Sequence, residues 1–74
     1  MRCLSDAPIG ESVRVTALLA RDLIKERMLA LGITKGTEIE VIRKGPKENL
    51  TVFAIRGAMV ALRKEEAKLI LISD

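Results

Sequence analysis

The chain has 74 residues, a length that allows one domain near the lower limit for folding unaided. Thirteen lysines and arginines against ten aspartates and glutamates give a net charge of +3, and the signs alternate along most of the sequence, which favours a solvated mixed surface over the clustered basic face usual in a dedicated nucleic-acid binder. The single cysteine, Cys3, excludes an internal disulfide and a cysteine metal cage, and the absence of histidine leaves its thiol without an ordinary catalytic base.

Apolar residues make up 49% of the sequence, which is more than a core of this size can absorb. A chain this short buries only about 60% of the surface that its unfolded form exposes. Some apolar side chains should therefore remain on the surface, and a contiguous patch of them would mark a partner site. The N-terminus lacks the apolar region of a signal peptide, and no uncharged run approaches the length of a membrane helix. We expect a soluble, cytoplasmic protein that works by binding.

The N-terminal part of the chain predicts a turn followed by a strand. Pro8 and Gly10 lie close together in a polar stretch, which is typical of a turn. Over residues 12–17, Val13 and Val15 alternate with polar or charged residues, the period of a half-buried strand.

A helix is predicted over residues 23–31. Asp22 is placed to cap its first turn, and Gly32 to end it. One stripe of the helix is apolar at the spacing i, i+4, i+7 and should face the core: Ile24, Met28 and Leu31.

The rest of the chain predicts short strands joined by tight turns. Residues 33–36 suit a turn into a strand over 37–42, in which Ile39 and Val41 share a face. The later elements are a hairpin loop over 44–49, a strand over 50–55 that is apolar on both faces, a strand over 59–63, a short helix over 64–67 and a last strand over 69–72. Turn roles are assigned to Gly10, Gly32, Gly36, Gly45, Pro46 and Gly57. Five short strands and one helix of about ten residues favour a small barrel, because closure removes exposed edges.

Two motif-like features carry no chemistry. Residues 32–37, "GITKGT", have the wrong glycine spacing for a phosphate-binding loop and lie after a helix and before a strand, the reverse of the required order. Glu65 and Glu66 are adjacent, but no partner with a perturbed pKa can be named for acid–base work. We therefore expect no enzymatic activity.

Glycines and aliphatic residues follow a distinctive order and spacing along nearly the whole chain. They are Leu4-x5-Gly10, then Arg27-Met28-x2-Leu31-Gly32-Ile33-x2-Gly36-x2-Ile39-x-Val41, then Gly45-Pro46, and finally Ile55-x-Gly57-x2-Val60-Ala61-Leu62-Arg63-x2-Glu66-Ala67-x2-Ile70-x-Ile72. This pattern resembles the FeoA family of bacterial ferrous iron uptake. Met28 stands where leucine is more usual, a volume-conserving change that should cost little.

The resemblance implies a mainly β fold over residues 1–74, a five-stranded SH3-like barrel with one inserted helix. It also implies an accessory role, without a cofactor, beside FeoB, the membrane iron transporter with a cytoplasmic GTPase domain. The same module resembles the C-terminal domain of iron-dependent repressors, so the fold alone does not decide the function. A stand-alone regulatory domain of that kind stays open as an alternative.

Surplus aliphatic residues suggest where a partner could dock, or a second copy could associate weakly. If Ile70 and Ile72 face inward, their neighbours in the last strand face outward, as do Val52 and Ala54 in an earlier one. The residues expected to form this surface are Lys25, Arg27, Leu29, Arg63, Leu69 and Leu71. The alternative is that the helix and loops cover these aliphatic residues as a second layer of core.

Metal and nucleic-acid binding are weaker expectations. Ferrous iron prefers a prearranged set that includes imidazole, so Glu38 and Glu40 alone predict no tight metal site. An RNA-binding barrel stays open as a rival, but its base-stacking platform would have to be Phe53, the only aromatic residue. The cations that would then contact phosphates are Arg43, Lys44 and Lys47. A third alternative is a peptide that pairs with residues 50–55 as an added strand.

Overall fold

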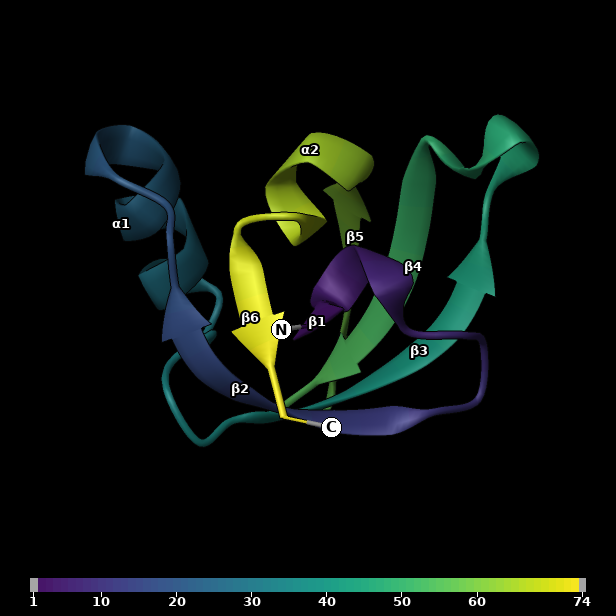
Figure 1. Cartoon of the computed structure of the whole chain (residues 1–74), viewed down its shortest axis with the longest axis horizontal. Helices are drawn as coiled ribbons and strands as arrows, with labels where there is room; N and C mark the ends of the chain where they lie inside the picture. The colour runs from purple at the N-terminus through teal and green to yellow at the C-terminus, as the bar shows by residue number, and fades with distance from the viewer. Residues whose placement is uncertain (1, 74) are drawn as a thin grey trace.

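The computed structural model describes residues 2–73, apart from the side chain of Glu48, and folds them into one antiparallel sheet of six strands in the order β1-β6-β2-β3-β4-β5 (Figure 1). The strands are β1 (Arg2–Cys3), β2 (Ser12–Leu18), β3 (Glu38–Lys44), β4 (Leu50–Ile55), β5 (Ala58–Arg63) and β6 (Ile70–Ile72). The helices are α1 (Asp22–Ala30), α2 (Lys64–Ala67) and the short 3-10 turns η1 (Leu4–Asp6) and η2 (Pro46–Glu48).

The five predicted strands are present, and β1 is an additional one. It is only two residues long, too short to show a period in the sequence, and it exists because Arg2 and Cys3 pair with Ile72 and Leu71 of β6. Cys3 thus lies beside the sheet, half-buried, with a free thiol.

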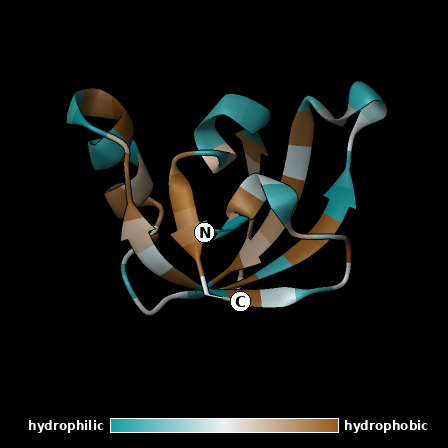
Figure 2. Cartoon of the chain, in the orientation of Figure 1, coloured by the Kyte–Doolittle hydropathy of each residue, from teal (hydrophilic) through white to brown (hydrophobic). Residues whose placement is uncertain are grey.

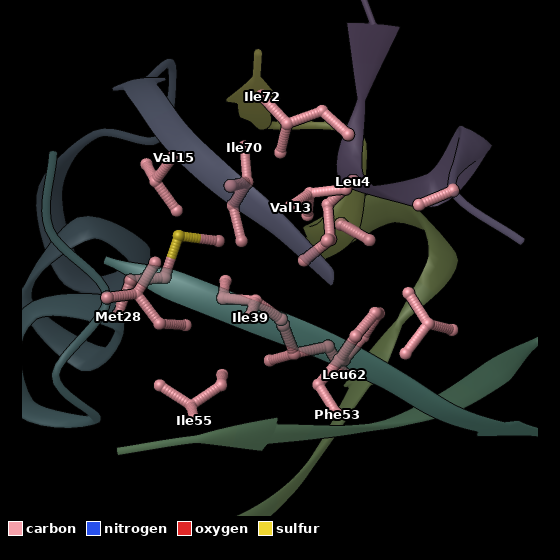
Figure 3. Close-up of a cluster of buried hydrophobic side chains, with 14 of the residues drawn as sticks. Leu4, Val13, Val15, Met28, Ile39, Phe53, Ile55, Leu62, Ile70 and Ile72 are labelled. Carbon is pink, nitrogen blue, oxygen red and sulfur yellow. The ribbon is translucent and has the colours of Figure 1, made fainter. Parts of the chain in front are cut away.

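Side chains point alternately to the two faces of each strand, so the apolar residues of one face pack against a common core. Brown and teal or white segments alternate along β2 and β3 in Figure 2. The strand residues of the core include Val13, Val15, Ile39, Val41, Phe53, Ile55, Leu62, Ile70 and Ile72, most of which Figure 3 shows converging on one cluster. The inward faces predicted for β2, β3, β4 and β6 are therefore confirmed.

Helix α1 begins one residue earlier than predicted. Of its predicted apolar stripe, the residue in the first turn does not pack in the core. Arg21 is the N-cap, and Asp22 already belongs to the helix, so the assignment of Asp22 as the cap was wrong. Met28 is buried and Leu31 half-buried, but Ile24 is 44% exposed. The stripe fails at Ile24 because the first turn extends past the core, where this side chain lines a groove at the surface.

The tight turn between β4 and β5 depends on an arginine in an unusual conformation. Arg56 has φ 49° and Gly57 has φ 82°, so both central residues of the turn are left-handed, as in the hairpin turns that favour Asn-Gly. The guanidinium of Arg56 donates from Nε to the carbonyl of Gly32 (2.9 Å) and from Nη2 to Oγ1 of Thr37 (3.3 Å). These bonds tie the β4–β5 turn to the end of α1 and offset the conformational cost.

Replacing Arg56 with asparagine tests which effect is larger. Asparagine suits the turn better, but it cannot reach Gly32 or Thr37, so we expect a net loss of about 1 kcal/mol in the free energy of unfolding. Urea denaturation followed by circular dichroism measures it, with Arg56→Lys as the control that keeps the charge but not the fork of donors. An Arg56→Asn variant more stable than the parent would show that turn conformation dominates.

Candidate protein-docking groove

A groove open to solvent lies where α1, α2 and the β4–β5 hairpin approach one another. Its lining residues are Ile24, Arg27, Leu50, Ala61, Arg63, Glu65 and Glu66, and an adjoining hollow adds Asn49. Elements far apart in the sequence therefore contribute to one surface, with aliphatic side chains between charged ones.

The strand side of the groove follows from the register of β4 and β5. Leu50 lies opposite Arg63, and Ala61 lies opposite Val52. Because side chains alternate along a strand and Leu62 points into the core, Ala61 and Arg63 point to the outer face. Leu50 is 44% exposed there, so the hairpin presents an aliphatic side chain beside a guanidinium.

The helix side of the groove is fixed by Glu66. Its Oε2 forms an ion pair with Nη1 of Arg27, and its Oε1 accepts a hydrogen bond from the backbone N–H of Arg63 (2.8 Å). The second bond follows the spacing of a helix capping box, in which the third helical residue reaches back to the N-cap amide. One carboxylate thus joins α1 to the end of β5 and holds the two walls of the groove.

The structure brings only part of the predicted docking surface together. Arg27 and Arg63 both line the groove. Lys25 and Leu29 are exposed on α1 but do not line it.

The two leucines predicted on the outer face of β6 are covered more than expected. Leu71 lies between strands, opposite Cys3 of β1 and Ala17 of β2, and is half-buried. Leu69 is half-buried as well and packs against the core. The neighbouring strands supply this cover because β6 lies inside the sheet rather than at its edge.

The residues that sequence reasoning missed at the groove are Ile24, Leu50, Ala61, Glu65 and Glu66. Ile24 was assigned to the core, and nothing in a single sequence shows where a helix extends past it. For Glu66 a signal was present, because the spacing Arg63-x2-Glu66 before a short helix is that of a capping box.

The structure also bears on the other surfaces considered. Phe53 is 1% exposed, so its ring is enclosed in the core and not available for stacking on bases. Strand β4 is paired on both sides, by β3 and by β5, so residues 50–55 cannot take an added strand, and the expectation that they could was wrong.

In residues 2–73 no three histidine, cysteine, aspartate or glutamate side chains gather as metal ligands would. None of the helices in the same part of the chain has the length and hydropathy needed to cross a bilayer.

A six-stranded antiparallel sheet with one inserted helix and a groove between helix and hairpin defines a mainly β, SH3-like module, the fold class that the sequence predicted. The closure expected of a five-stranded barrel is not complete, because β1 and β5 end the sheet without pairing with each other. The family follows from the sequence itself. The model of the FeoA domain matches residues 2–74, and the chain belongs to this family, which implies an accessory role in ferrous iron transport.

Solved structures of FeoA proteins agree with this assignment. A FeoA-like protein from Clostridium acetobutylicum is 31% identical with a TM-score of 0.88, over 96% of this chain and 83% of that one. FeoA from Stenotrophomonas maltophilia, solved with zinc and described as a prokaryotic SH3 domain protein, is 30% identical with a TM-score of 0.87, over 99% of this chain and 91% of that one.

The fold is shared more widely than the family. A manganese-dependent transcriptional repressor is 20% identical with a TM-score of 0.88, over 97% of this chain but 40% of the repressor, which shows a likeness in fold alone. No curated protein matches the chain in sequence.

Proposed function

We propose that the protein is a cytoplasmic accessory factor of ferrous iron uptake that docks on the GTPase domain of a FeoB-type transporter through the groove between α1, α2 and the β4–β5 hairpin. The observation that carries the proposal is the FeoA domain over residues 2–74, joined in one chain with this groove. The S. maltophilia relative is itself described as a candidate activating factor of bacterial ferrous iron transport.

The groove fits a protein surface better than a small molecule or a metal ion. It is open, and its aliphatic side chains lie beside two arginines and two glutamates, which suits a partner surface with an apolar centre and a polar rim. SH3 domains that bind proline-rich peptides use aromatic grooves, and this groove contains no aromatic residue. We therefore infer recognition of aliphatic side chains on the GTPase domain, without a metal ion or cofactor held by this chain.

An NMR titration of the labelled protein with the soluble GTPase domain tests the proposal. We expect saturable shifts confined to the groove, at the amides of Ile24, Arg27, Leu50 and Ala61. A short RNA is the control titrant. Salt-sensitive shifts at Arg43 and Lys47 with RNA, and none with the GTPase domain, would favour the nucleic-acid alternative instead.

Two residues of α1 form a matched pair for measuring the contribution of the groove. Ile24 and Leu29 are both 44% exposed, but only Ile24 lines the groove. We expect Ile24→Ser to weaken binding of the GTPase domain at least about tenfold, as loss of a central aliphatic contact does, and Leu29→Ser to leave it within about twofold. Isothermal titration calorimetry gives the affinities and urea denaturation the stabilities. The reverse ranking would move the docking site to the other face of α1.

A further inference from the structure

The sheet ends in a strand whose outer edge has no partner. In the described part of the chain, β5 pairs with β4 and with no other strand. The opposite end of the sheet is β1, which has only two residues, whereas β5 has six. Residues 58–62 contain no charge and no proline, and β5 pairs with β4 without a bulge, so the features that usually block edge-to-edge association are missing.

Two hydrogen bonds show which backbone groups of β5 face outward. The N–H of Lys64 donates to the carbonyl of Asn49 (3.0 Å), one step beyond the pairing of Arg63 with Leu50. In an antiparallel ladder the hydrogen-bonded pairs alternate. Leu62, Val60 and Ala58 therefore direct their backbone groups toward β4.

The N–H of Gly45 donates to the carbonyl of Leu50 (2.6 Å), which turns the backbone of Leu50 toward β3 and leads to the same alternation. The backbone groups of Met59, Ala61 and Arg63 then face away from β4. The amide of Arg63 is already bound to Glu66. No bond within residues 2–73 involves the outward amides of Met59 and Ala61.

These two residues are also accessible. Met59 is 68% exposed, and Ala58 and Ala61 are exposed as well, so this part of β5 lies at the surface. An accessible, uncharged edge with two free amides is a site for an added strand.

We propose that this edge pairs with β5 of a second copy of the chain, antiparallel and about a two-fold axis. In one register Met59 lies opposite Ala61 of the second copy, and Ala61 opposite its Met59. Both are then hydrogen-bonded pairs, which gives four N–H···O=C bonds and leaves the bond between Arg63 and Glu66 intact.

The two neighbouring registers form fewer hydrogen bonds between the copies. A shift that puts Ala61 opposite itself needs the amide of Arg63, which Glu66 occupies. A shift that puts Met59 opposite itself pairs Ala61 with Gly57, which lies in the turn at φ 82°. The edge is thus complementary to itself in a single register.

The side chains agree with this register. Val60, half-buried on the inner face, would lie against Val60 of the second copy at the axis, where strands approach most closely. The long side chain of Met59 would lie over the methyl group of Ala61 from the other copy. No charged residue of β5 would face a like charge, because Arg63 lies opposite Gly57. Because the paired segment carries no charge, it offers nothing to bind a charged partner strand, whereas a second copy of the uncharged segment matches it.

The contact involves one strand from each copy and buries less than the roughly 1,600 Å² of a standard interface, so we expect a weak dimer with a Kd on the order of 0.1 mM. This inference goes beyond the proposed function, because it concerns pairing of the chain with itself. The edge and the groove share Ala61 and Arg63, so dimerisation is measured on the isolated protein, and docking on the GTPase domain is measured below the Kd of the dimer.

Sedimentation equilibrium of the isolated protein over about 0.02–2 mM tests the proposal, with a proline placed on the edge. Ala61→Pro removes the N–H of residue 61, which forms no hydrogen bond in the monomer but donates across the interface in the dimer. The fold should therefore survive, and dimerisation should be lost. Ala61→Ser keeps the N–H and is the matched control, expected to dimerise within about threefold of the parent.

A second variant keeps the test decisive if Ala61→Pro fails to fold. Met59→Lys changes an exposed side chain and brings like charges close on either side of the axis, and we expect it to weaken the dimer at least about tenfold. A parent protein that stays monomeric throughout the range would overturn the proposal. A dimer that Met59→Lys leaves unchanged would overturn it too.

Discussion

Phe53→Ala is expected to lower the free energy of unfolding by about 3–5 kcal/mol, the usual cost of removing a fully buried aromatic ring. Phe53 is 1% exposed and lies in the middle of β4, opposite Val41 on one side and Val60 on the other. A domain of 74 residues has a total stability of roughly 4–11 kcal/mol. The variant should therefore lose between about a quarter and all of its stability.

Urea denaturation followed by far-ultraviolet circular dichroism measures the loss, since the chain has no tryptophan to report by fluorescence. Phe53→Leu is the control, because it keeps most of the volume and should cost about 1–1.5 kcal/mol. A loss below about 1 kcal/mol for Phe53→Ala would mean that the ring is not enclosed, and stacking on a nucleic-acid base would again have to be considered.

The strands were predictable because each carries its own period. In β2 and β3 the alternation that a single sequence shows is the alternation that the sheet buries, β4 is marked instead by an apolar run between two turns, and the glycines at 32, 36 and 57 mark turns where φ is positive. These local rules do not depend on which strands become neighbours. Strand β1 does depend on it, since two residues become a strand only through pairing with β6.

The groove was less predictable, because its position depends on how α1 lies over the sheet. Arg27 and Arg63 are 36 positions apart in the sequence, and Glu66, which is bound to both, joins them at one surface. The same holds for Thr37, a buried polar residue whose Oγ1 donates to the carbonyl of Gly32 (3.1 Å) and accepts from Arg56. Nothing in its local sequence distinguishes it from an ordinary turn threonine.

The open edge of β5 illustrates a third kind of limit. The sequence indicated strands over 50–55 and 59–63 but not which of them would end the sheet. An added strand on residues 50–55 is therefore a prediction that the sequence allows and the strand order contradicts. Strand order is set by non-local pairing, so the choice between an inner and an outer strand could come only from the structure.

Met28→Ala is expected to cost about 2–5 kcal/mol and to loosen α1 in particular. Of the nine residues of α1, Met28 alone is buried, and Figure 3 shows its side chain entering the same cluster as Val15, Ile39 and Ile55. The ion pair between Arg27 and Glu66 also holds the helix, but the Arg27 side chain is about half exposed, so we expect the pair to contribute less than burial of Met28. Hydrogen exchange should therefore show that the amides of α1 lose protection before those of β2 to β4.

Two control variants separate the loss of the buried Met28 side chain from a general effect of substitution in α1. Leu29→Ala changes the next residue, which is 44% exposed, and should stay within about 0.5 kcal/mol of the parent. Met28→Leu conserves volume and should stay within about 1.5 kcal/mol. If Met28→Ala costs no more than Leu29→Ala, α1 is held by something other than this side chain.

The functional consequence of Met28→Ala follows from the position of α1 as one wall of the groove. A helix that detaches carries Ile24 and Arg27 away from Leu50 and Arg63. Affinity for the GTPase domain should then fall even at temperatures where the sheet remains folded, and Met28→Leu should restore it. Self-pairing along β5 uses backbone groups of the sheet and should persist in the same variant. Binding and dimerisation would thus respond differently to one substitution, because one surface includes α1 and the other does not.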